Sequence, residues 1–281
     1  MLLKGKPVAD QIKKEIIAAV EQCKKEGKNL PQLAIIRVGD RADDIAYEAR
    51  VLKNCNEVGI ETKVVEVDHN VDTVNLINIV NQLNNDTEVH GILIFRPLPA
   101  HLDSDAICNT ISPLKDIDCM NPINMQKVFQ GDSSGIAPCT PEAVVEILKY
   151  YDYDLKGKKI AIVNRSMVLG KPLSMLLLSE NATVTICHSK TKNLEKVTAD
   201  ADIVVSGVGK AKYFGTEYFT KDSTVIDVGI NFEDNKMCGD VDFERVSQCV
   251  AAITPVPGGV GTVTSMILLK HVIQAMNMQN E

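Results

Sequence analysis

The chain has 281 residues, a formal net charge of −7 and 45% hydrophobic residues, a balance typical of a soluble globular protein and not of a disordered one. The net acidity argues against a general nucleic-acid binder, and no apolar run approaches the length of a membrane span. The eight cysteines form no Cys-X-X-Cys pair, which favours reduced thiols over a disulfide framework or a metal site. We therefore expect a cytoplasmic protein without metal, nucleic-acid or membrane partners.

Short β-branched runs alternate with amphipathic helical stretches along the first half of the chain. The predicted elements are a helix at 8–25, a strand at 33–38, a helix at 46–58, a strand at 62–67, a helix at 71–83 and a strand at 91–95. This alternation predicts a mostly parallel sheet covered by helices.

A second set of elements begins near Thr140, where Pro141 suits the first position of a helix. It comprises a helix at 140–150, strands at 159–163, 183–187, 202–205 and 224–228, and a last helix at 265–276. Between the two sets, 113–138 is rich in Pro and Gly with weak periodicity, so a domain boundary is expected there. The last helix follows a Gly-rich loop and is expected to pack back on the first domain.

The strand at 159–163 runs into a turn and then into a helix opened by Pro172. Ligands of open α/β sheets bind beyond the carboxyl ends of strands, and helix N-termini favour phosphate. The Gly-X-Gly-X-X-Gly spacing is absent and only Gly170 lies at the turn. By pattern alone, a dinucleotide site and an ordinary strand–helix connection are equally favoured.

The next strand ends at Cys187, and the segment after it, His188 to Lys192, contains no acidic residue. Sites selective for the unphosphorylated cofactor often place an Asp or Glu there to bind the ribose hydroxyls. Together with Arg165, the cations of this segment suit a ribose 2′-phosphate, while a solvated basic loop is the alternative. His188 is more simply explained as a polar loop contact than as a general base.

Three glycine-containing loops, 206–209, 227–231 and 254–261, follow or adjoin predicted strands. Glycine permits close approach of the backbone to a ligand, and proline fixes the direction of the chain. The combination of both in 254–261 indicates a ligand-facing loop.

Taken together, these motifs resemble the bifunctional methylenetetrahydrofolate dehydrogenase/cyclohydrolase family over essentially the whole chain. The most specific segments are Arg96-Pro97-Leu98-Pro99, Lys115-Asp116-Ile117-Asp118, Pro138-Cys139-Thr140-Pro141, Arg165-Ser166 with Gly170-Lys171-Pro172, Asp227-Val228-Gly229-Ile230-Asn231, Gly239-Asp240-Val241-Asp242 and Pro255-Val256-Pro257-Gly258-Gly259-Val260-Gly261.

The resemblance implies a two-domain α/β fold with a cleft between the domains, and a homodimer. An N-terminal α/β folate-binding domain would comprise 1–138 with 264–281, and a Rossmann-like parallel-sheet cofactor domain would comprise 139–263. The implied reaction, part of one-carbon metabolism, is oxidation of 5,10-methylenetetrahydrofolate to 5,10-methenyltetrahydrofolate by hydride transfer to NADP, with NAD as the alternative cofactor.

The resemblance also assigns roles to individual residues. Tyr47 would offer its ring face to the folate, and Asp118 would accept paired hydrogen bonds from the pterin. Without the resemblance, a core tyrosine is the favoured interpretation of Tyr47, and on spacing alone a turn aspartate is nearly as well favoured for Asp118. The further substrate-binding positions are Pro97, Leu98, Pro257, Gly258 and Gly259. The cofactor-binding positions are Asn164, Arg165, Ser166, Gly170, Ser189, Lys190, Gly207, Gly229, Ile230 and Thr264.

The chain departs from the family's signature Ser-X2-Tyr-X3-Lys, which lies on one helix. Tyr47 is kept, but Asp44 replaces the Ser and Val51 replaces the catalytic Lys; Phe95 replaces a Gln before the Leu-Pro-Leu-Pro segment. Hydride transfer requires only alignment, whereas hydrolysis of the methenyl group requires proton transfers. We therefore expect a dehydrogenase without efficient cyclohydrolase activity, followed by a separate cyclohydrolase.

Lesser departures are Cys119 and Asn164 in place of Gly, and Thr262 in place of Pro. Two alternatives stay open at this point. One is a bifunctional enzyme with a rearranged site that uses Asp44 or Arg50, and the other is a non-catalytic regulator that binds folate or a dinucleotide.

Overall fold

The computed structural model describes residues 1–234 and 236–280. The chain divides into two compact units, each with its own parallel sheet. The three-stranded unit comprises Gln11–Val128, Asp132–Ala137 and the chain from Ser265 onward. The five-stranded unit comprises Met1–Asp10, Phe129–Gly131 and Pro138–Thr264. No helix within the described residues is long and apolar enough to cross a membrane.

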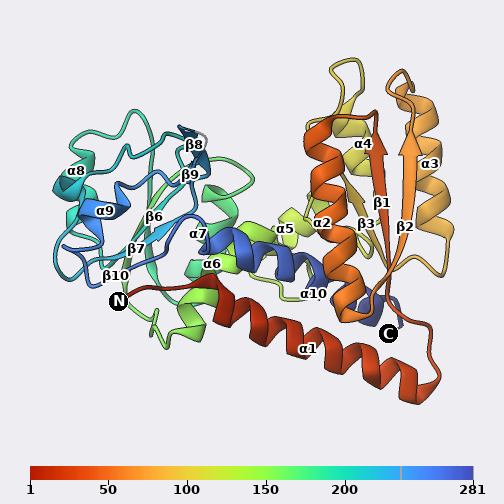
Figure 1. Cartoon of the computed structure of the whole chain (residues 1–281), viewed down its shortest axis with the longest axis horizontal. Coiled ribbons are helices and arrows are strands. Elements are labelled where there is room, and N and C mark those ends of the chain that lie inside the picture. Colours follow the sequence, from red (N-terminus) through yellow and green to blue (C-terminus); the bar gives the residue numbers. More distant parts are fainter. Residues whose placement is uncertain (235, 281) are drawn as a thin grey trace. The chain divides into compact units, whose positions relative to one another are not determined.

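The three-stranded unit is built on a parallel sheet with the order β2-β1-β3 (Figure 1). Its strands are β1 (Gln32–Val38), β2 (Glu61–Val67) and β3 (Gly91–Ile94). The connecting helices are α2 (Ala42–Val58) and α3 (Thr73–Asn85). Because β-branched and aliphatic residues alternate with the pleat, one sheet face and α3 share a core that includes Ile36, Leu76, Val80 and Ile92.

The five-stranded unit has a parallel sheet with the order β10-β7-β6-β4-β5. Its strands are β4 (Lys159–Val163), β5 (Thr183–Cys187), β6 (Ile203–Ser206), β7 (Thr224–Asp227) and β10 (Ala252–Ile253). The chain passes from β4 to β5 on one side and then returns to β6 on the other. The strand order therefore reverses at β4 and β6, which is the topological switch point where open α/β sheets bind ligands.

Further elements complete the fold. The long helices are α1 (Gly5–Glu26) and α10 (Val260–Asn280), and the shorter ones are α4 (Ser104–Thr110), α5 (Pro122–Gln130), α6 (Cys139–Tyr150), α7 (Gly170–Ser179), α8 (Leu194–Ala199) and α9 (Phe243–Val246). A short 3-10 turn, η1, spans Thr216–Tyr218, and an antiparallel hairpin joins β8 (Asn231–Glu233) to β9 (Lys236–Cys238).

The predicted α/β class is confirmed, because both main sheets are parallel and are linked by helices. The last helix does pack in the three-stranded unit, where the buried His271 ring hydrogen-bonds the Ile117 carbonyl at 2.9 Å. However, α10 begins at Val260 and not at Ser265. Gly258 has a left-handed φ of 98°, so it ends the loop and lets the helix start immediately after it.

Helices α4 and α5 were among the elements not predicted: α5 lies in 113–138, where weak periodicity indicated a domain boundary, and α4 lies just before it, where no element was predicted. Helix α5 begins at Pro122, so the prolines of 113–138 partly mark a helix start and not only a linker. Helix α4 is capped by Asp103, whose carboxylate accepts a hydrogen bond from Ala106 N at 3.0 Å. Both starts carry a sequence signal that the weak hydrophobic periodicity concealed.

Candidate functional site

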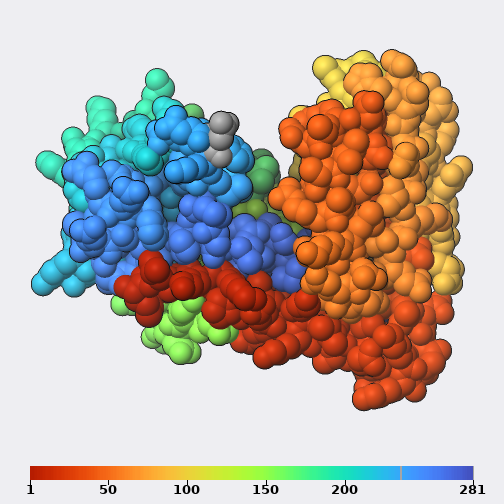
Figure 2. Space-filling model, in the orientation of Figure 1, coloured from red at the N-terminus to blue at the C-terminus, as the bar shows by residue number. Residues whose placement is uncertain are grey.

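Helix α2 and the end of β3 bring together an aromatic and apolar group, which we call the Tyr47 cluster: Tyr47, Arg50, Val51 and Phe95. The rings of Tyr47 and Phe95 are tilted by 55° with centroids 5.2 Å apart. The residue Tyr47 is 37% exposed, whereas Val51 is 4% and Phe95 5% exposed. In the space-filling view, the orange segment that includes α2 forms part of the outer surface of its unit (Figure 2). Tyr47 is thus a surface tyrosine with a partly open ring, and the reading of a core tyrosine is wrong.

The cationic residue of the cluster is Arg50, whose guanidinium carbon lies 5.6 Å from the centre of the Tyr47 ring. Such a contact is attractive because the ring face carries negative partial charge. Val51 occupies the next position on the helix and is buried. Position 51 therefore has no side chain that could accept and release a proton. Arg50 does not replace such a group, because a guanidinium stays protonated.

The start of α2 is tied to the segment after β3. The Arg41 guanidinium donates to the Pro97 carbonyl at 3.2 Å and lies 3.8 Å from the Asp44 carboxylate. Pro97 is exposed and follows Arg96 through a cis peptide bond, and Leu98 is half-buried. The structure therefore brings the predicted positions Tyr47, Pro97 and Leu98 onto adjoining elements of one unit.

Helix α2 is also held against the sheet by a buried ion pair. Arg37 of β1 donates to the Glu48 carboxylate at 2.8 Å and to the Gly39 carbonyl at 2.6 Å, and it pairs with Glu66 of β2 at 2.9 Å. The hydrogen bond with Glu48 is the main reason that the pKa of Arg37 is raised. Because Glu48 follows Tyr47 in sequence, this pair fixes the rotation of the helix that presents the tyrosine.

The segment between α4 and α5, which carries Asp118, is organised by Asp116. The fully buried Asp116 carboxylate accepts hydrogen bonds from Met120 N and Asn121 N at 2.8 Å and from the Asn124 amide at 3.0 Å. Burial raises the pKa of Asp116, and these donors oppose the rise. Asp118 itself is half-buried on this segment. Asp116 thus orders the loop that carries Asp118.

Two other residues of the same motif serve the fold. Lys115 is buried, and its ammonium donates to the carbonyls of Leu83 and Asp86 at 3.0 and 2.6 Å, which satisfies the C-terminal end of α3. Cys119, where the resemblance expects Gly, has a left-handed φ of 54°. The backbone there keeps the conformation that glycine would favour, although a side chain is present.

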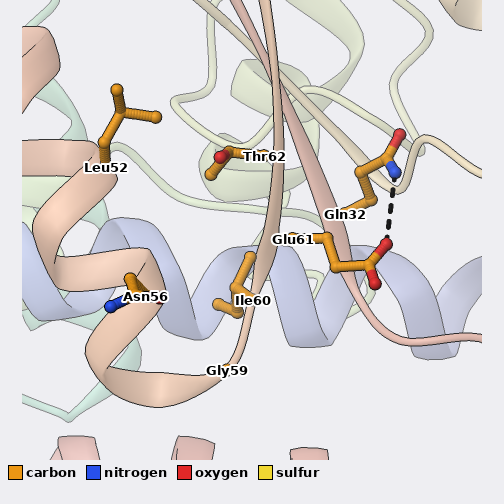
Figure 3. A pocket seen from close by; sticks show the side chains of 7 residues that line it. All are labelled: Gln32, Leu52, Asn56, Gly59, Ile60, Glu61 and Thr62. Atoms are coloured by element: carbon orange, nitrogen blue, oxygen red, sulfur yellow. Dashed lines mark hydrogen bonds between the residues drawn. The ribbon is translucent and has the colours of Figure 1, made fainter.

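A separate open cavity of about 440 Å³ lies at the other end of α2 (Figure 3). Gln32 and Glu61, the first residues of β1 and β2, line it and are joined by a hydrogen bond of 3.4 Å. It therefore lies at the amino ends of the parallel strands. Ligands of such sheets bind at the carboxyl ends, where the Phe95 and Asp118 segments begin, so we do not assign the reaction to this cavity.

In the five-stranded unit, the turn between β4 and α7 is organised by the Asn164 side chain. Its carbonyl oxygen accepts hydrogen bonds from Ser166 N at 2.8 Å, Ser166 Oγ at 2.8 Å and Gly170 N at 3.0 Å. Its amide nitrogen donates to the carbonyl of Gly207, which directly follows β6. A Cβ on Gly170 would lie 2.0 Å from the backbone carbonyl oxygen of Asn164, so this turn requires glycine there. The Asn164 side chain thus joins the β4–α7 turn to the loop after β6 at the topological switch point.

Arg165 lies in the same turn and is exposed. Within residues 1–234 and 236–280, no hydrogen bond or ion pair engages its guanidinium. Ser189 and Lys190, after the neighbouring strand β5, are likewise exposed. His188 Nδ1 accepts from Lys190 N at 3.1 Å, so His188 shapes its own loop. This edge of the sheet offers an uncommitted cation and no acidic side chain at the end of β5, which fits a phosphorylated ribose.

Two further loops at the same edge are ordered by a pair of buried carboxylates. Asp227 accepts from Gly229 N at 3.0 Å, Val241 N at 2.9 Å and Ser206 Oγ at 3.2 Å. Burial raises the pKa of Asp227 to about 6, since its N–H donors only partly offset the loss of water and the repulsion from Asp240.

Asp240 accepts from Gly209 N at 3.2 Å, from Lys210 N at 2.9 Å and also from Val208 N. A Cβ on Gly229 would lie 2.3 Å from its carboxyl carbon, which explains the glycine. The loops after β6 and β7 are therefore ordered from inside the fold, while Ile230 remains exposed beside them.

The glycine-rich loop before α10 serves packing as well. Gly5 N donates to the Gly258 carbonyl at 2.8 Å, and a Cβ on Gly259 would lie 2.4 Å from the Pro255 carbonyl oxygen. Pro257 and Gly258 are exposed, and Gly259 is buried. Thr264 lies within α10, and its hydroxyl donates to the Val260 carbonyl at 3.1 Å. Close backbone packing alone accounts for Gly259, so the glycine content of this loop is weaker evidence for a ligand than the sequence indicated.

Fold and site together define a two-domain α/β protein with a dinucleotide-type sheet edge in one unit and an aromatic cluster with a carboxylate loop in the other. Comparison with known proteins agrees with this class. A model of the tetrahydrofolate dehydrogenase/cyclohydrolase catalytic domain matches residues 3–118, and a model of the NAD(P)-binding domain of the same family matches residues 138–280. The chain belongs to the tetrahydrofolate dehydrogenase/cyclohydrolase family.

Relatives and solved structures extend along the whole chain. The bifunctional protein FolD of Clostridium botulinum is 54% identical over 275 residues, which cover 98% of this chain and 97% of that protein. The bifunctional FolD structure from Campylobacter jejuni has a TM-score of 0.96 at 38% identity, with 99% of each chain covered. The Trypanosoma brucei FolD, described as complexed with NADP cofactor and inhibitor, has a TM-score of 0.93 at 32% identity and covers 100% of this chain and 98% of that one.

The sequence analysis did not identify the buried residues that hold the loops of the candidate site by hydrogen bonds. Arg37, Asp116 and Asp240 are buried. Their hydrogen bonds hold segments that carry candidate ligand-binding residues, yet none of the three was predicted to be functional. Asp116 and Asp240 lie inside motifs that the resemblance singled out, so a signal existed. What a sequence does not reveal is which acidic residue of a short motif turns inward to collect backbone N–H groups.

Proposed function

We propose that this chain oxidises 5,10-methylenetetrahydrofolate to 5,10-methenyltetrahydrofolate by hydride transfer to NADP, as part of one-carbon metabolism. The observation that carries the proposal is the match to both the catalytic and the NAD(P)-binding domain of one family. Exposed Arg165 and the acid-free loop after β5 support NADP over NAD, and the Trypanosoma brucei relative is described with NADP.

The proposed roles follow from what hydride transfer requires. The nicotinamide, when bound, accepts the hydride, and no proton moves in that step, so the protein mainly aligns donor and acceptor carbons. The partly open ring of Tyr47 offers a flat surface for the folate. The Asp118 carboxylate, held on the loop that Asp116 orders, accepts hydrogen bonds from the pterin N–H groups. Both roles are alignment roles.

An absorbance assay tests the dehydrogenase directly. Purified protein is mixed with methylenetetrahydrofolate and either NADP or NAD, and formation of the reduced nicotinamide is followed. We expect reduction with both to be possible but catalytic efficiency to be higher with NADP. Absence of reduction with either cofactor, by protein that is folded, would contradict the proposal and would favour the non-catalytic alternative.

We further propose that efficient cyclohydrolase activity has been lost. Addition of water to the methenyl group and opening of the ring both need a group that transfers protons. At the helix position where the resemblance expects a lysine, Val51 is buried, and Phe95 packs on Tyr47 where it expects a glutamine. Neither side chain can transfer a proton, and neither can bind a water molecule.

The second candidate is a bifunctional enzyme with a rearranged site. It is favoured by the relatives, which are named bifunctional proteins. The residues at hand would be Asp44, whose side chain is 13% exposed beside Arg41, and Arg50. We favour the monofunctional proposal because Arg50 stays protonated and because Asp44 already faces a cation. Under the monofunctional proposal a separate cyclohydrolase consumes the methenyl product.

The domain roles and the assembly are part of the same proposal. Residues 1–138 with 264–281 would bind the folate, and 139–263 would bind the cofactor. A homodimer is supported by the β8–β9 hairpin, where the cross-strand neighbours Phe232 and Met237 are 70% and 37% exposed. Apolar side chains exposed in one patch favour a protein partner. Light scattering should give twice the chain mass, and a monomer at micromolar concentration would contradict this part.

A further inference from the structure

The β4–α7 turn is ordered by an amide, as are the backbone segments that Asn84 and Asn121 hold, whereas three other loops of this chain are ordered by carboxyl groups. Asp116, Asp227 and Asp240 each collect several N–H donors with a carboxyl side chain. Asn164 performs the same task, because its carbonyl oxygen accepts from Ser166 N, Ser166 Oγ and Gly170 N. A cluster of donors is better satisfied by an ionised carboxylate than by a neutral oxygen. What the neutral side chain contributes at position 164 therefore depends on its surroundings.

Two features of the surroundings give the neutral charge of Asn164 an electrostatic consequence. Asn164 directly follows β4, and its amide bonds the carbonyl after β6, so it lies at the switch point of the sheet. The adjoining Arg165 is an exposed cation without a partner in the described part of the chain. An aspartate at 164 would cancel part of this positive potential and would repel an anion bound there.

We propose that Asn164 is a positioning and specificity residue: its neutral amide orders the β4–α7 turn while leaving the potential at the switch point favourable for the phosphates of a dinucleotide. The inference rests on the proposed use of NADP and deepens it. Two demands meet at this side chain. It must accept from the turn as the three aspartates do elsewhere, and it must not carry their charge. Asparagine meets both, and its N–H donor additionally ties the turn to Gly207.

The test exchanges the charge and keeps the shape. Asn164→Asp retains an oxygen that accepts from Ser166 and Gly170 but adds a negative charge and loses the donor to Gly207. We expect NADP to bind about tenfold more weakly or worse, NAD to lose less because it carries fewer charges, and the loss to shrink as ionic strength rises. Dissociation constants for NADP and NAD at low and high salt are measured by titration calorimetry.

Asn181→Asp is the matched control. Asn181 is exposed, has a left-handed φ of 63° that Asp also tolerates, and precedes β5 at the opposite, amino edge of the sheet. It changes the net charge by the same amount and should leave both dissociation constants unchanged. Asn164→Gly, which restores the residue that the resemblance expects, should weaken NADP and NAD by similar factors, because it removes the ordering without adding charge.

The outcomes separate this inference from the proposed function. If the unmodified protein binds NADP and Asn164→Asp binds it equally well, the inference is wrong and the proposed function stands. If Asn164→Asp weakens NADP and NAD equally and independently of salt, Asn164 is only structural and the inference is again wrong. Should Asn164→Asp not fold, Asn164→Gly decides, and unchanged binding by that variant would overturn the ordering role. An unmodified protein that binds neither nucleotide would contradict both.

Discussion

The carboxyl edge of the five-stranded sheet and the Tyr47 cluster of the three-stranded unit differ in their polar groups. In the five-stranded unit, Asn164, Asp227 and Asp240 order the loops at the carboxyl edge of the sheet through hydrogen bonds. In the three-stranded unit, the Tyr47 cluster has Val51 and Phe95 where the resemblance expects a lysine and a glutamine. The difference corresponds to the two steps of the family's chemistry. Under the proposed function, groups that align a cofactor are kept, whereas Val51 and Phe95 cannot transfer protons.

The sharpest way to test this contrast is to restore the proton-transfer pair. The double change Val51→Lys with Phe95→Gln should raise methenyl hydrolysis, because it supplies a titratable amine and an amide to orient it. General acid–base catalysis contributes about a hundred- to ten-thousandfold, which bounds the expected gain. Decay of the methenyl absorbance measures it.

Val51→Lys alone should gain less, and the size-matched Val51→Met with Phe95→Leu should gain nothing. All variants should keep dehydrogenase activity, which confirms that the cluster is folded. A double variant that is active as a dehydrogenase but hydrolyses no faster than the unmodified protein would show that other groups are also missing.

In the five-stranded unit, we expect the free energy of unfolding to depend on pH through the buried Asp227 carboxyl. The folded-state pKa of Asp227 is raised to about 6, above the ordinary value of 3.8, because the carboxylate is buried. Its contribution to stability is therefore fully present below pH 3.8 and is lost as the pH rises through about 6. A shift of this size corresponds to at most about 3 kcal/mol.

Asp227→Asn removes this titration. The free energy of unfolding, measured by urea denaturation from about pH 4 to about pH 8, should fall more with rising pH for the unmodified protein than for the variant. Asp222→Asn, an exposed carboxylate in the same unit, is the control and should follow the unmodified protein. Parallel pH profiles for all of these proteins would mean that the N–H donors to Asp227 fully offset its burial.

Cofactor selectivity tests whether the five-stranded unit retains a working site. Arg165→Ala should weaken NADP far more than NAD, because a guanidinium bonds a 2′-phosphate with about 1.5–3 kcal/mol per charged hydrogen bond. Dissociation constants by calorimetry give the two losses. Lys158→Ala removes an exposed cation just before β4, at the other edge of the sheet, and should change neither. Equal losses for both nucleotides on Arg165→Ala would place the arginine away from the 2′-phosphate.

The smallest expected effect concerns the polar group that the three-stranded unit keeps. Asp118→Ala should weaken folate binding by about 1–3 kcal/mol, because pterin donors would be left unpaired, while the fold and NADP binding stay unchanged. Asp118→Asn should lose nearly as much, since its N–H₂ group faces donors. Calorimetric titration with tetrahydrofolate measures both. Unchanged affinity in both variants would make Asp118 a turn residue only.

Much of the fold could be predicted because its elements are strongly patterned. The parallel strands are short β-branched runs, and β4 and β5 were placed at their observed ends. The weaker elements were missed for a physical reason. Helices α4 and α5 are short, so their starts depend on a capping Asp103 and on Pro122 more than on apolar periodicity.

The candidate site divides in the same way. Departures such as Val51 and Phe95 are visible in sequence because a motif fixes what should stand there. The roles of Asn164, Arg37 and Asp240 are not visible, because they depend on which donors a side chain meets after the chain folds. The extent of helix α10 into the glycine-rich loop could not be predicted either, since Gly258 ends the loop by its φ angle.

The central claim is that this chain aligns a hydride transfer and no longer catalyses the hydrolysis that follows it. The most direct measurement is the decay of 5,10-methenyltetrahydrofolate absorbance, without NADP, in a buffer that hydrolyses it slowly, with and without the purified and dehydrogenase-active protein. We predict that the protein leaves the decay close to the uncatalysed rate. Acceleration by several orders of magnitude would contradict the account and would direct attention to Asp44 and Arg50.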